Sequence, residues 1–219
     1  MNNPLPRLGV LFSGGGRTVE NLAQNIVEGS LQAEIAVAIS SHAGAGGVER
    51  AAKYGIRTEV LDYREHGSEL SARINEVLEE EKVDWVLLAG FIRYYEVPGS
   101  YRNKVLNIHP SLLPDFGGKG FYGMKVHQAV IEAGAELSGC TVHLVNDEYD
   151  EGPIIVQRAI ALEPGETPES LASRVFEQEC LAYPEAVRLC LSGQLHIEGK
   201  RIRLPTDEND QGESTASGS

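Results

Sequence analysis

Cysteine is scarce in this 219-residue chain, which contains only Cys140, Cys180 and Cys190. The number is odd, and no two of them have the Cys-x-x-Cys spacing of a zinc or redox site. Neither a disulfide framework nor a metal centre is indicated. We expect three reduced, packed thiols and no bound metal.

Long hydrophobic runs are also missing. No apolar stretch approaches the roughly 20 residues that a membrane-spanning helix needs. Residues 1–7 pass straight into a strand-like segment, without the apolar core of a secretory signal. We therefore expect a cytoplasmic protein with no membrane partner.

Basic residues are few, since 19 Lys and Arg stand against 32 Asp and Glu and the formal net charge is −13. A general nucleic-acid surface needs a basic footprint, so no nucleic-acid partner is expected. An acidic protein binds anionic small molecules through local devices, such as helix N-termini, glycine-rich turns and single arginines. The 42% content of hydrophobic residues is that of a folded globular chain.

Strands and helices alternate in the first half of the chain. Short apolar segments predict strands at residues 8–12, 34–40, 57–61, 84–89 and 104–108. Helical patterns fall between them, at residues 18–28, 47–54 and 68–81. This alternation predicts an α/β fold built from βαβ units, with a mainly parallel sheet flanked by helices.

The second half has a different pattern. We expect a loop rich in Gly and Pro over 113–123, a helix over 124–133, and strands at 140–145 and 154–161 that pair as an antiparallel extension. Thr167 and Pro168 predict the start of a helix that runs to residue 191. A hairpin is expected around Gly199, followed by a disordered acidic tail over 206–219.

A glycine turn at residues 13–18 follows the first strand and opens the first helix. Glycines let the backbone approach a ligand closely, and the free N–H groups of the helix start favour a phosphate. Arg17 can add a charge-assisted contact. The turn is neither a P-loop nor a complete Gly-x-Gly-x-x-Gly, because Val19 occupies the third glycine position. The alternative is a tight turn with no ligand.

The strongest candidate for chemistry is residues 107–114, Asn-Ile-His-Pro-Ser-Leu-Leu-Pro. Asn107 and His109 point to the same side of a strand, because side chains alternate. They lie at the carboxyl end of a parallel strand, where open α/β sheets bind ligands. An amide donor and an imidazole together can stabilise an oxyanion, and the imidazole can carry a proton. The alternative is a structural histidine.

Two further segments have both a functional and an ordinary interpretation. The acidic segment 146–152 can place one carboxylate against His109 and raise the pKa of its imidazole, or it can be a solvated turn. Residues 90–95 can line a pocket for a flat heterocycle, or can be core with one surface charge. Packing or surface roles are expected for the histidines that lack metal-ligand spacing, which are His42, His66, His127, His143 and His196.

Five segments together resemble the glycinamide ribonucleotide formyltransferase family: residues 12–16, 88–93, 107–114, 117–123 and 147–155. The resemblance covers residues 8–204. It implies one domain, residues 1–205, with a Rossmann-like half of about residues 1–100 that binds the ribonucleotide phosphate. The other half, about residues 101–205, contributes to the folate cleft. The implied substrates are glycinamide ribonucleotide and 10-formyltetrahydrofolate, bound by a monomer or a homodimer.

The resemblance also implies residue roles by position. Asn107, His109 and Asp150 match the catalytic trio, in which the amide and a protonated imidazole donate to the formyl oxygen and the carboxylate supports the imidazole. The residues implied in ribonucleotide binding are Gly15, Gly16, Arg17, Thr18 and Glu179. The residues implied in folate binding are Arg64, Ile92, Arg93, Tyr94, Tyr95, Asn107, Asn146 and Asp150.

The chain departs from the family pattern at two places. Arg17 and Thr18 follow the glycines where the family commonly has Ser-Asn, so we expect Arg17 to replace polar contacts to the phosphate with a charged one. Phe176 stands where a polar or basic residue often helps to bind the ribonucleotide, and that contact is expected to be missing.

Other functions stay open. A formyltetrahydrofolate hydrolase has the same trio but uses water as the acceptor, and usually carries an N-terminal regulatory domain that is not expected here. A methionyl-tRNA formyltransferase carries an added RNA-binding domain, which the charge of −13 also disfavours. A non-catalytic nucleotide-binding module of similar fold is the third alternative.

Overall fold

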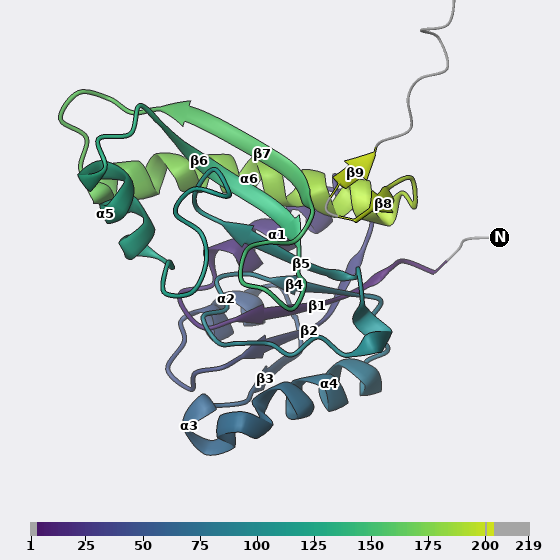
Figure 1. Cartoon of the computed structure of the whole chain (residues 1–219). Helices are drawn as coiled ribbons and strands as arrows, with labels where there is room; N and C mark the ends of the chain where they lie inside the picture. Colours follow the sequence, from purple (N-terminus) through teal and green to yellow (C-terminus); the bar gives the residue numbers. More distant parts are fainter. Residues whose placement is uncertain (1–3, 200, 204–219) are drawn as a thin grey trace, which may run out of the picture.

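The computed structural model describes residues 4–199 and 201–203, built around a seven-stranded sheet (Figure 1). The strand order is β3-β2-β1-β4-β5-β6-β7. The strands are β1 (Arg7–Phe12), β2 (Glu34–Ser40), β3 (Thr58–Val60), β4 (Trp85–Leu88), β5 (Val105–His109), β6 (Leu137–Leu144) and β7 (Ile154–Ala161). β1 to β5 pair in parallel, whereas β5 with β6 and β6 with β7 are antiparallel. The predicted mainly parallel sheet with an antiparallel extension is confirmed.

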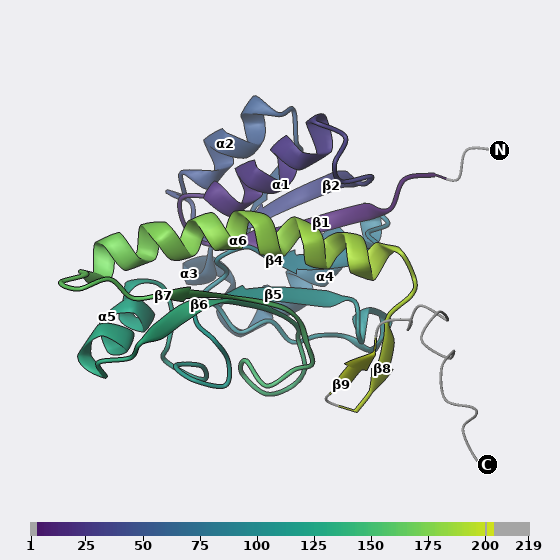
Figure 2. The ribbon, with the colours of Figure 1, turned by 90° about the horizontal axis from the view of Figure 1, so that it is seen from above.

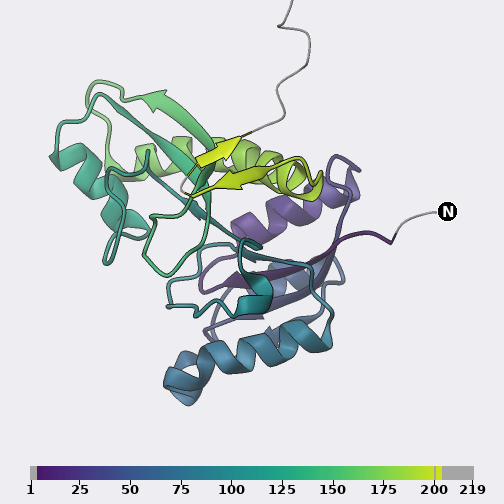
Figure 3. The ribbon, with the colours of Figure 1, turned by 45° about the vertical axis from the view of Figure 1, so that its right-hand side comes forward.

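Helices cover both faces of the sheet, as Figure 3 shows. The longer ones are α1 (Arg17–Val27), α2 (Gly47–Lys53), α4 (Leu70–Glu80), α5 (Met124–Glu132) and α6 (Pro168–Leu191). One hydrophobic core joins the sheet to α1, α2 and α6, and includes Leu22 and Tyr183. A second core on the opposite face joins it to α4 through Ile74 and Leu78. The sheet is therefore buried on both sides, which explains the continuous apolar runs in its strands.

The long helix α6 crosses the sheet beside α1 (Figure 2). It begins as predicted at Thr167, whose hydroxyl accepts from the Ser170 N–H at 3.2 Å, while the Ser170 hydroxyl accepts from the Thr167 N–H at 3.0 Å. Tyr183 is fully buried, and its hydroxyl lies 3.0 Å from the carbonyl oxygen of Leu88 and 3.2 Å from that of Leu106. These contacts fasten α6 to β4 and β5.

The structure departs most from the predicted elements around residues 63–69, before β5 and at the start of β6. The helix expected over 68–81 is preceded by the short α3 (Tyr63–His66) and the 3-10 turn η1 (Gly67–Glu69). Asp62 caps α3 by accepting from the Arg64 N–H at 2.8 Å, and Gly67 breaks the helix with a φ of 50°. A second 3-10 turn, η2 (Gly99–Tyr101), lies before β5. The strand expected over 140–145 starts earlier, because Gly139 allows backbone contact with β7 that a side chain would block.

The predicted hairpin is also confirmed. It consists of β8 (His196–Glu198) and β9 (Arg201–Arg203), which pair antiparallel.

The predicted tail, 206–219, lies outside the described residues. In the described part of the chain, no helix has the length and apolar character needed to cross a bilayer.

The topology places three loops at one edge of the sheet. The chain order reverses between β1 and β4, and open α/β sheets bind ligands beside such a point, outside the carboxyl ends of their strands. β1 leads into the glycine turn, β4 leads into residues 89–95, and β5 ends at His109. The predicted functional segments therefore meet at a single edge.

Candidate active site

A cleft of about 700 Å³ opens at this edge. Its walls include the glycine turn 14–18, residues 88–95 after β4, the end of β5, the loop 118–123, the acidic segment around Asp150, and α6 at Phe176 and Glu179. The cleft thus brings together all but one of the predicted site residues. The exception is Arg64, which is exposed and is absent from the cleft lining, so its role in folate binding stays a prediction.

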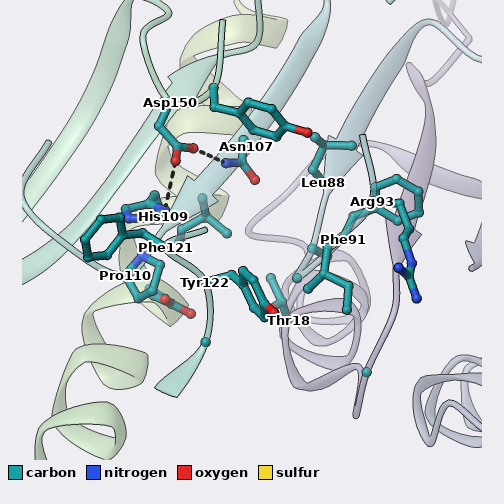
Figure 4. A pocket seen from close by; sticks show the side chains of 18 of the residues that line it. Thr18, Leu88, Phe91, Arg93, Asn107, His109, Pro110, Phe121, Tyr122 and Asp150 are labelled. Atoms are coloured by element: carbon teal, nitrogen blue, oxygen red, sulfur yellow. Dashed lines mark hydrogen bonds and ion pairs between the residues drawn. The ribbon is translucent and has the colours of Figure 1, made fainter. Parts of the chain in front are cut away.

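The side chains of Asn107, His109 and Asp150 converge in this cleft (Figure 4). The Nδ2 atom of Asn107 donates to Oδ1 of Asp150 at 3.3 Å. The Oδ2 atom of Asp150 lies 3.5 Å from Nδ1 of His109. The residue pattern alone left open which carboxylate of the acidic segment faces His109; the structure places Asp150, the one that the family resemblance implied, next to both partners.

Asp150 is held in a constrained position. Its φ is 57°, in the left-handed region that a non-glycine residue rarely adopts. Its Oδ2 atom also accepts from the Gly118 N–H at 2.9 Å. Burial raises the pKa of the Asp150 carboxyl, but the neighbouring imidazoles of His143 and His109 and the Gly118 N–H outweigh it, so the net pKa lies below the ordinary value. Asp150 is ionised at neutral pH.

His109 is buried, with both ring nitrogens engaged. Nε2 lies 2.9 Å from the carbonyl oxygen of Phe116 and therefore carries a hydrogen, which leaves Nδ1 facing Asp150. Burial lowers the pKa of His109 below 6.5, and the charge of Asp150 opposes that change without reversing it. The predicted upward shift of this pKa is therefore wrong in net direction, although Asp150 acts in the predicted sense. Burial destabilises the charged imidazole more than the single carboxylate at 3.5 Å stabilises it.

His143 belongs to the same cluster, although the sequence predicted only packing. Its Nδ1 lies 2.9 Å from the Leu144 carbonyl oxygen and must carry the hydrogen, so Nε2 is an acceptor when the ring is neutral. Nε2 lies 3.2 Å from Nδ2 of Asn107 and 3.5 Å from Oδ1 of Asp150. Both amide hydrogens of Asn107 are thus directed at His143 and Asp150, and its oxygen is directed away from Asp150 (Figure 4).

The glycine turn is built to approach a ligand. Gly16 has a φ of 73° and packs its Cα against Gly47, where a Cβ would overlap the backbone. No side chain caps the start of α1, so its first N–H groups remain available to an anion. The guanidinium of Arg17 lies over the ring of Phe176, 3.9 Å from its centroid. Burial raises the pKa of Glu179 to about 7, and Arg17 opposes this rise.

The segment after β4 forms the opposite wall. Ser13 connects it to the glycine turn, because its hydroxyl accepts from the Ile92 N–H at 3.1 Å and lies 2.7 Å from the Ser41 hydroxyl. The Tyr95 hydroxyl donates to Asn75 at 2.7 Å. Ile92 and Tyr94 are exposed at the cleft, and the Tyr94 ring lies 5.6 Å from that of Tyr149.

Arg93 and Asn146 complete the predicted folate residues that the structure places in the cleft lining. The guanidinium of Arg93 lies 4.2 Å from the centroid of the Tyr63 ring. Figure 4 shows this side chain on the far side of the cleft from Asp150. The contacts of both residues with a folate stay predictions.

Sequence reasoning missed His127 as a cleft residue. It lies on α5, is 5% exposed and lines the cleft near His109. Its Nδ1 atom has no hydrogen-bond partner within the described residues. Burial first, and the charge of His109 second, lower its pKa to about 4, so the ring is neutral. The only signal in the sequence was its place three residues into a helix that follows the glycine-rich loop.

This sheet and cleft define an α/β enzyme that binds small molecules outside the carboxyl ends of its strands. Residues 6–187 match the family model described as formyl transferase. The chain belongs to the formyl transferase family.

Three relatives illustrate the similarity. The chain is 41% identical to a chloroplastic phosphoribosylglycinamide formyltransferase of Arabidopsis thaliana, over 94% of this chain and 71% of that protein. It is 40% identical to the trifunctional purine biosynthetic protein adenosine-3 of Gallus gallus, over 87% of this chain but only 19% of that protein. The chain therefore spans about a fifth of the length of that trifunctional relative. A solved structure, glycinamide ribonucleotide transformylase 1 of Symbiobacterium toebii, is 39% identical, with a TM-score of 0.86 and coverage of 91% of this chain and 94% of that one.

Proposed function

We propose that this chain transfers the formyl group of 10-formyltetrahydrofolate to the amine of glycinamide ribonucleotide, a step of purine biosynthesis. The names of the relatives in Arabidopsis thaliana and Symbiobacterium toebii support the reaction and the acceptor. The observation that carries the proposal is the convergence of Asn107, His109 and Asp150 in a cleft that also contains an uncapped glycine turn. Group transfer and phosphate binding thus share one site.

The cleft has a place for each substrate. The phosphate of glycinamide ribonucleotide lies against the N–H groups of residues 15–18, with Arg17 and Glu179 beside it. The pterin ring of the folate lies against residues 92–95, between the exposed side chains of that wall, with Asn146 and Asp150 near its formyl end. This division brings the amine and the formyl carbon together beside Asn107 and His109.

The chemical step is attack of the substrate amine on the formyl carbon. Negative charge develops on the formyl oxygen and positive charge on the attacking nitrogen. Positioning and charge stabilisation are sufficient for this step, so no residue of the chain needs to form a covalent intermediate.

His109 provides the donor for the formyl oxygen. Its Nε2–H lies 2.9 Å from the Phe116 carbonyl oxygen, so donation to the formyl oxygen requires this hydrogen to leave that acceptor. Asp150 faces the other ring nitrogen and stabilises the imidazolium as charge develops. The bond between the formyl carbon and the folate nitrogen then breaks, and one proton passes from the amine to that nitrogen through the imidazole or a water molecule.

Asn107 acts on the amine in the arrangement described. Because its Nδ2 is occupied by His143 and Asp150, its oxygen accepts a hydrogen bond from the attacking amine. Donation from Asn107 to the formyl oxygen, as expected from the sequence, requires the amide to turn over and lose both contacts.

The test is formyl release from 10-formyltetrahydrofolate with and without glycinamide ribonucleotide. The proposal expects release only with the acceptor, together with formation of formylglycinamide ribonucleotide. Release without the acceptor indicates a hydrolase, and no release under either condition indicates a binding module. Methionyl-tRNA as a second acceptor distinguishes the remaining alternative. Monomer or homodimer, and the cytoplasmic location, stay predictions.

A further inference from the structure

Arg17 and Phe176 meet at the phosphate end of the cleft although they are far apart in the sequence. Arg17 is the first residue of α1, and Phe176 lies on α6, which packs against α1. The Cζ atom of Arg17 lies 3.9 Å from the centroid of the Phe176 ring, and both side chains line the cleft. This distance is that of a close cation–π contact.

The Arg17 guanidinium has no hydrogen bond or ion pair with any residue in the described part of the chain. Other arginines of this acidic protein do pair with carboxylates, as shown by Arg50 with Glu20, Arg158 with Glu185 and Arg174 with Glu166. An aromatic ring stacks on the flat face of a guanidinium. The N–H groups point outward from the edge of the guanidinium and stay free to donate hydrogen bonds. The Phe176 ring therefore holds the Arg17 side chain in place, while the N–H donors of its guanidinium remain available to a ligand.

The same end of the cleft contains the carboxylate of Glu179, and the charge of Arg17 opposes the rise of its pKa. Glu179 lines the cleft one helical turn after Phe176, and burial raises its pKa to about 7. The N–H groups at the start of α1 are uncapped and adjoin Arg17 in the sequence. The start of α1 thus offers an anion both its uncapped backbone N–H groups and the side-chain donors of Arg17.

We infer that Phe176 is a positioning residue for phosphate recognition, which stacks on Arg17 and holds its guanidinium toward the phosphate of the acceptor substrate. The inference rests on the proposed function for the identity of that substrate. Arginine loses considerable side-chain freedom when it binds a ligand, and stacking removes part of that freedom beforehand. The two positions at which the chain departs from the family pattern, Arg17 and Phe176, then act together in phosphate binding.

The test is a double-mutant cycle with Arg17→Ala, Phe176→Leu and the combined variant, measured as the KM for glycinamide ribonucleotide. Arg17→Ala should raise this KM about 10- to 100-fold, as expected for a hydrogen bond to a charged group. Phe176→Leu keeps an apolar side chain but removes the ring, and should raise it about two- to fivefold. The combined variant should be no worse than Arg17→Ala, because Phe176 acts only through Arg17. The KM for the formyl donor should stay the same in all three.

Two controls separate positioning from a structural effect. Phe176→Tyr keeps the ring, so its KM for glycinamide ribonucleotide should equal that of the parent protein, unlike the KM of Phe176→Leu. Leu181→Ala removes an exposed apolar side chain elsewhere on α6 and should change neither KM. Additive effects of Arg17→Ala and Phe176→Leu, or failure of Phe176→Tyr to restore the KM, would overturn the inference.

A binding measurement makes the test independent of formyl transfer. Ribose 5-phosphate should bind the parent protein in calorimetry more tightly than ribose, and both Arg17→Ala and Phe176→Leu should weaken it. If glycinamide ribonucleotide is not formylated but this pattern holds, the proposed function fails and phosphate binding by Arg17 and Phe176 stands. If ribose 5-phosphate binds equally to parent and variants, Arg17 and Phe176 do not act in phosphate binding, whatever the reaction is.

Discussion

The Nε2 atom of His143 lies 3.2 Å from the Nδ2 atom of Asn107, across the antiparallel pair of β6 and β5. The Leu144 carbonyl oxygen fixes a hydrogen on the other ring nitrogen, so in the neutral ring Nε2 is the acceptor and the amide is the donor. Turning the amide over would place its oxygen against an imidazole acceptor and the Asp150 carboxylate. His143 therefore sets which end of the Asn107 amide faces the cleft.

Replacing His143 tests this control of Asn107. His143→Leu removes the acceptor and frees the amide to rotate, so kcat should fall about 10- to 100-fold while both KM values stay within about twofold. Steady-state kinetics at saturating substrate gives the numbers, with circular dichroism as the check on folding. A folded variant with the kcat of the parent would mean that Asn107 is oriented without His143.

Asp150→Asn tests the charge of the carboxylate with little change in shape. The amide oxygen of Asn can still accept from the Gly118 N–H, which the Asp150 side chain does at 2.9 Å. Because the negative charge of Asp150 raises the pKa of His109, its loss should lower that pKa further and reduce kcat at least about a hundredfold. NMR titration of the His109 ring measures the first effect. An unchanged or higher pKa would contradict the electrostatic role given to Asp150.

His109→Ala removes the proposed donor to the formyl oxygen. Loss of one such donor typically raises the barrier by about 3–4 kcal/mol, so kcat should fall at least about a hundredfold. His109→Gln is a useful companion, because its amide can still donate and should retain more activity than His109→Ala. Near-parent turnover of His109→Ala, measured under single-turnover conditions, would remove His109 from the mechanism.

The sequence was informative wherever local pattern decides structure. Short continuous apolar runs predicted the strands, period-3.6 apolar patterns predicted the helices, and the Thr167 cap placed the start of α6 correctly. The register of β6 against β5, which sets His143 opposite Asn107, depends on tertiary packing and could not be predicted. The same holds for the contact of Arg17 with Phe176, and for the burial that reverses the expected shift of the His109 pKa.

Gly152 fixes the segment that carries Asp150. A Cβ at this position would overlap the carbonyl oxygen of Leu144, a backbone atom that cannot move aside cheaply. Gly152→Ala should therefore displace Asp150, lowering kcat at least about tenfold, and cost about 1–3 kcal/mol of unfolding free energy. Gly99→Ala is the matched control, because the space around Gly99 is open. Equal kinetics and equal urea midpoints for the two variants would show that the segment tolerates the side chain.

His127 should make the protein less stable in mild acid. Its pKa is about 4 in the folded protein and about 6.5 when unfolded, so between these values only the unfolded state binds the proton. The stabilising contribution of the neutral ring is present above pH 6.5 and is lost as the pH falls toward 4. Because one pKa unit corresponds to about 1.4 kcal/mol, the unfolding free energy should fall by about 3 kcal/mol over this range.

His127→Gln isolates that contribution, because glutamine keeps a polar side chain and does not titrate. Urea unfolding at pH 6.5, 5.5 and 4.5 gives the free energy for both proteins, and their difference cancels the titration of His109 and the carboxylates to first order. The parent protein should lose stability more steeply, with the gap between the two curves narrowing or reversing toward pH 4.5. Curves that remain parallel would show that His127 is protonated in the folded protein as readily as in the unfolded chain.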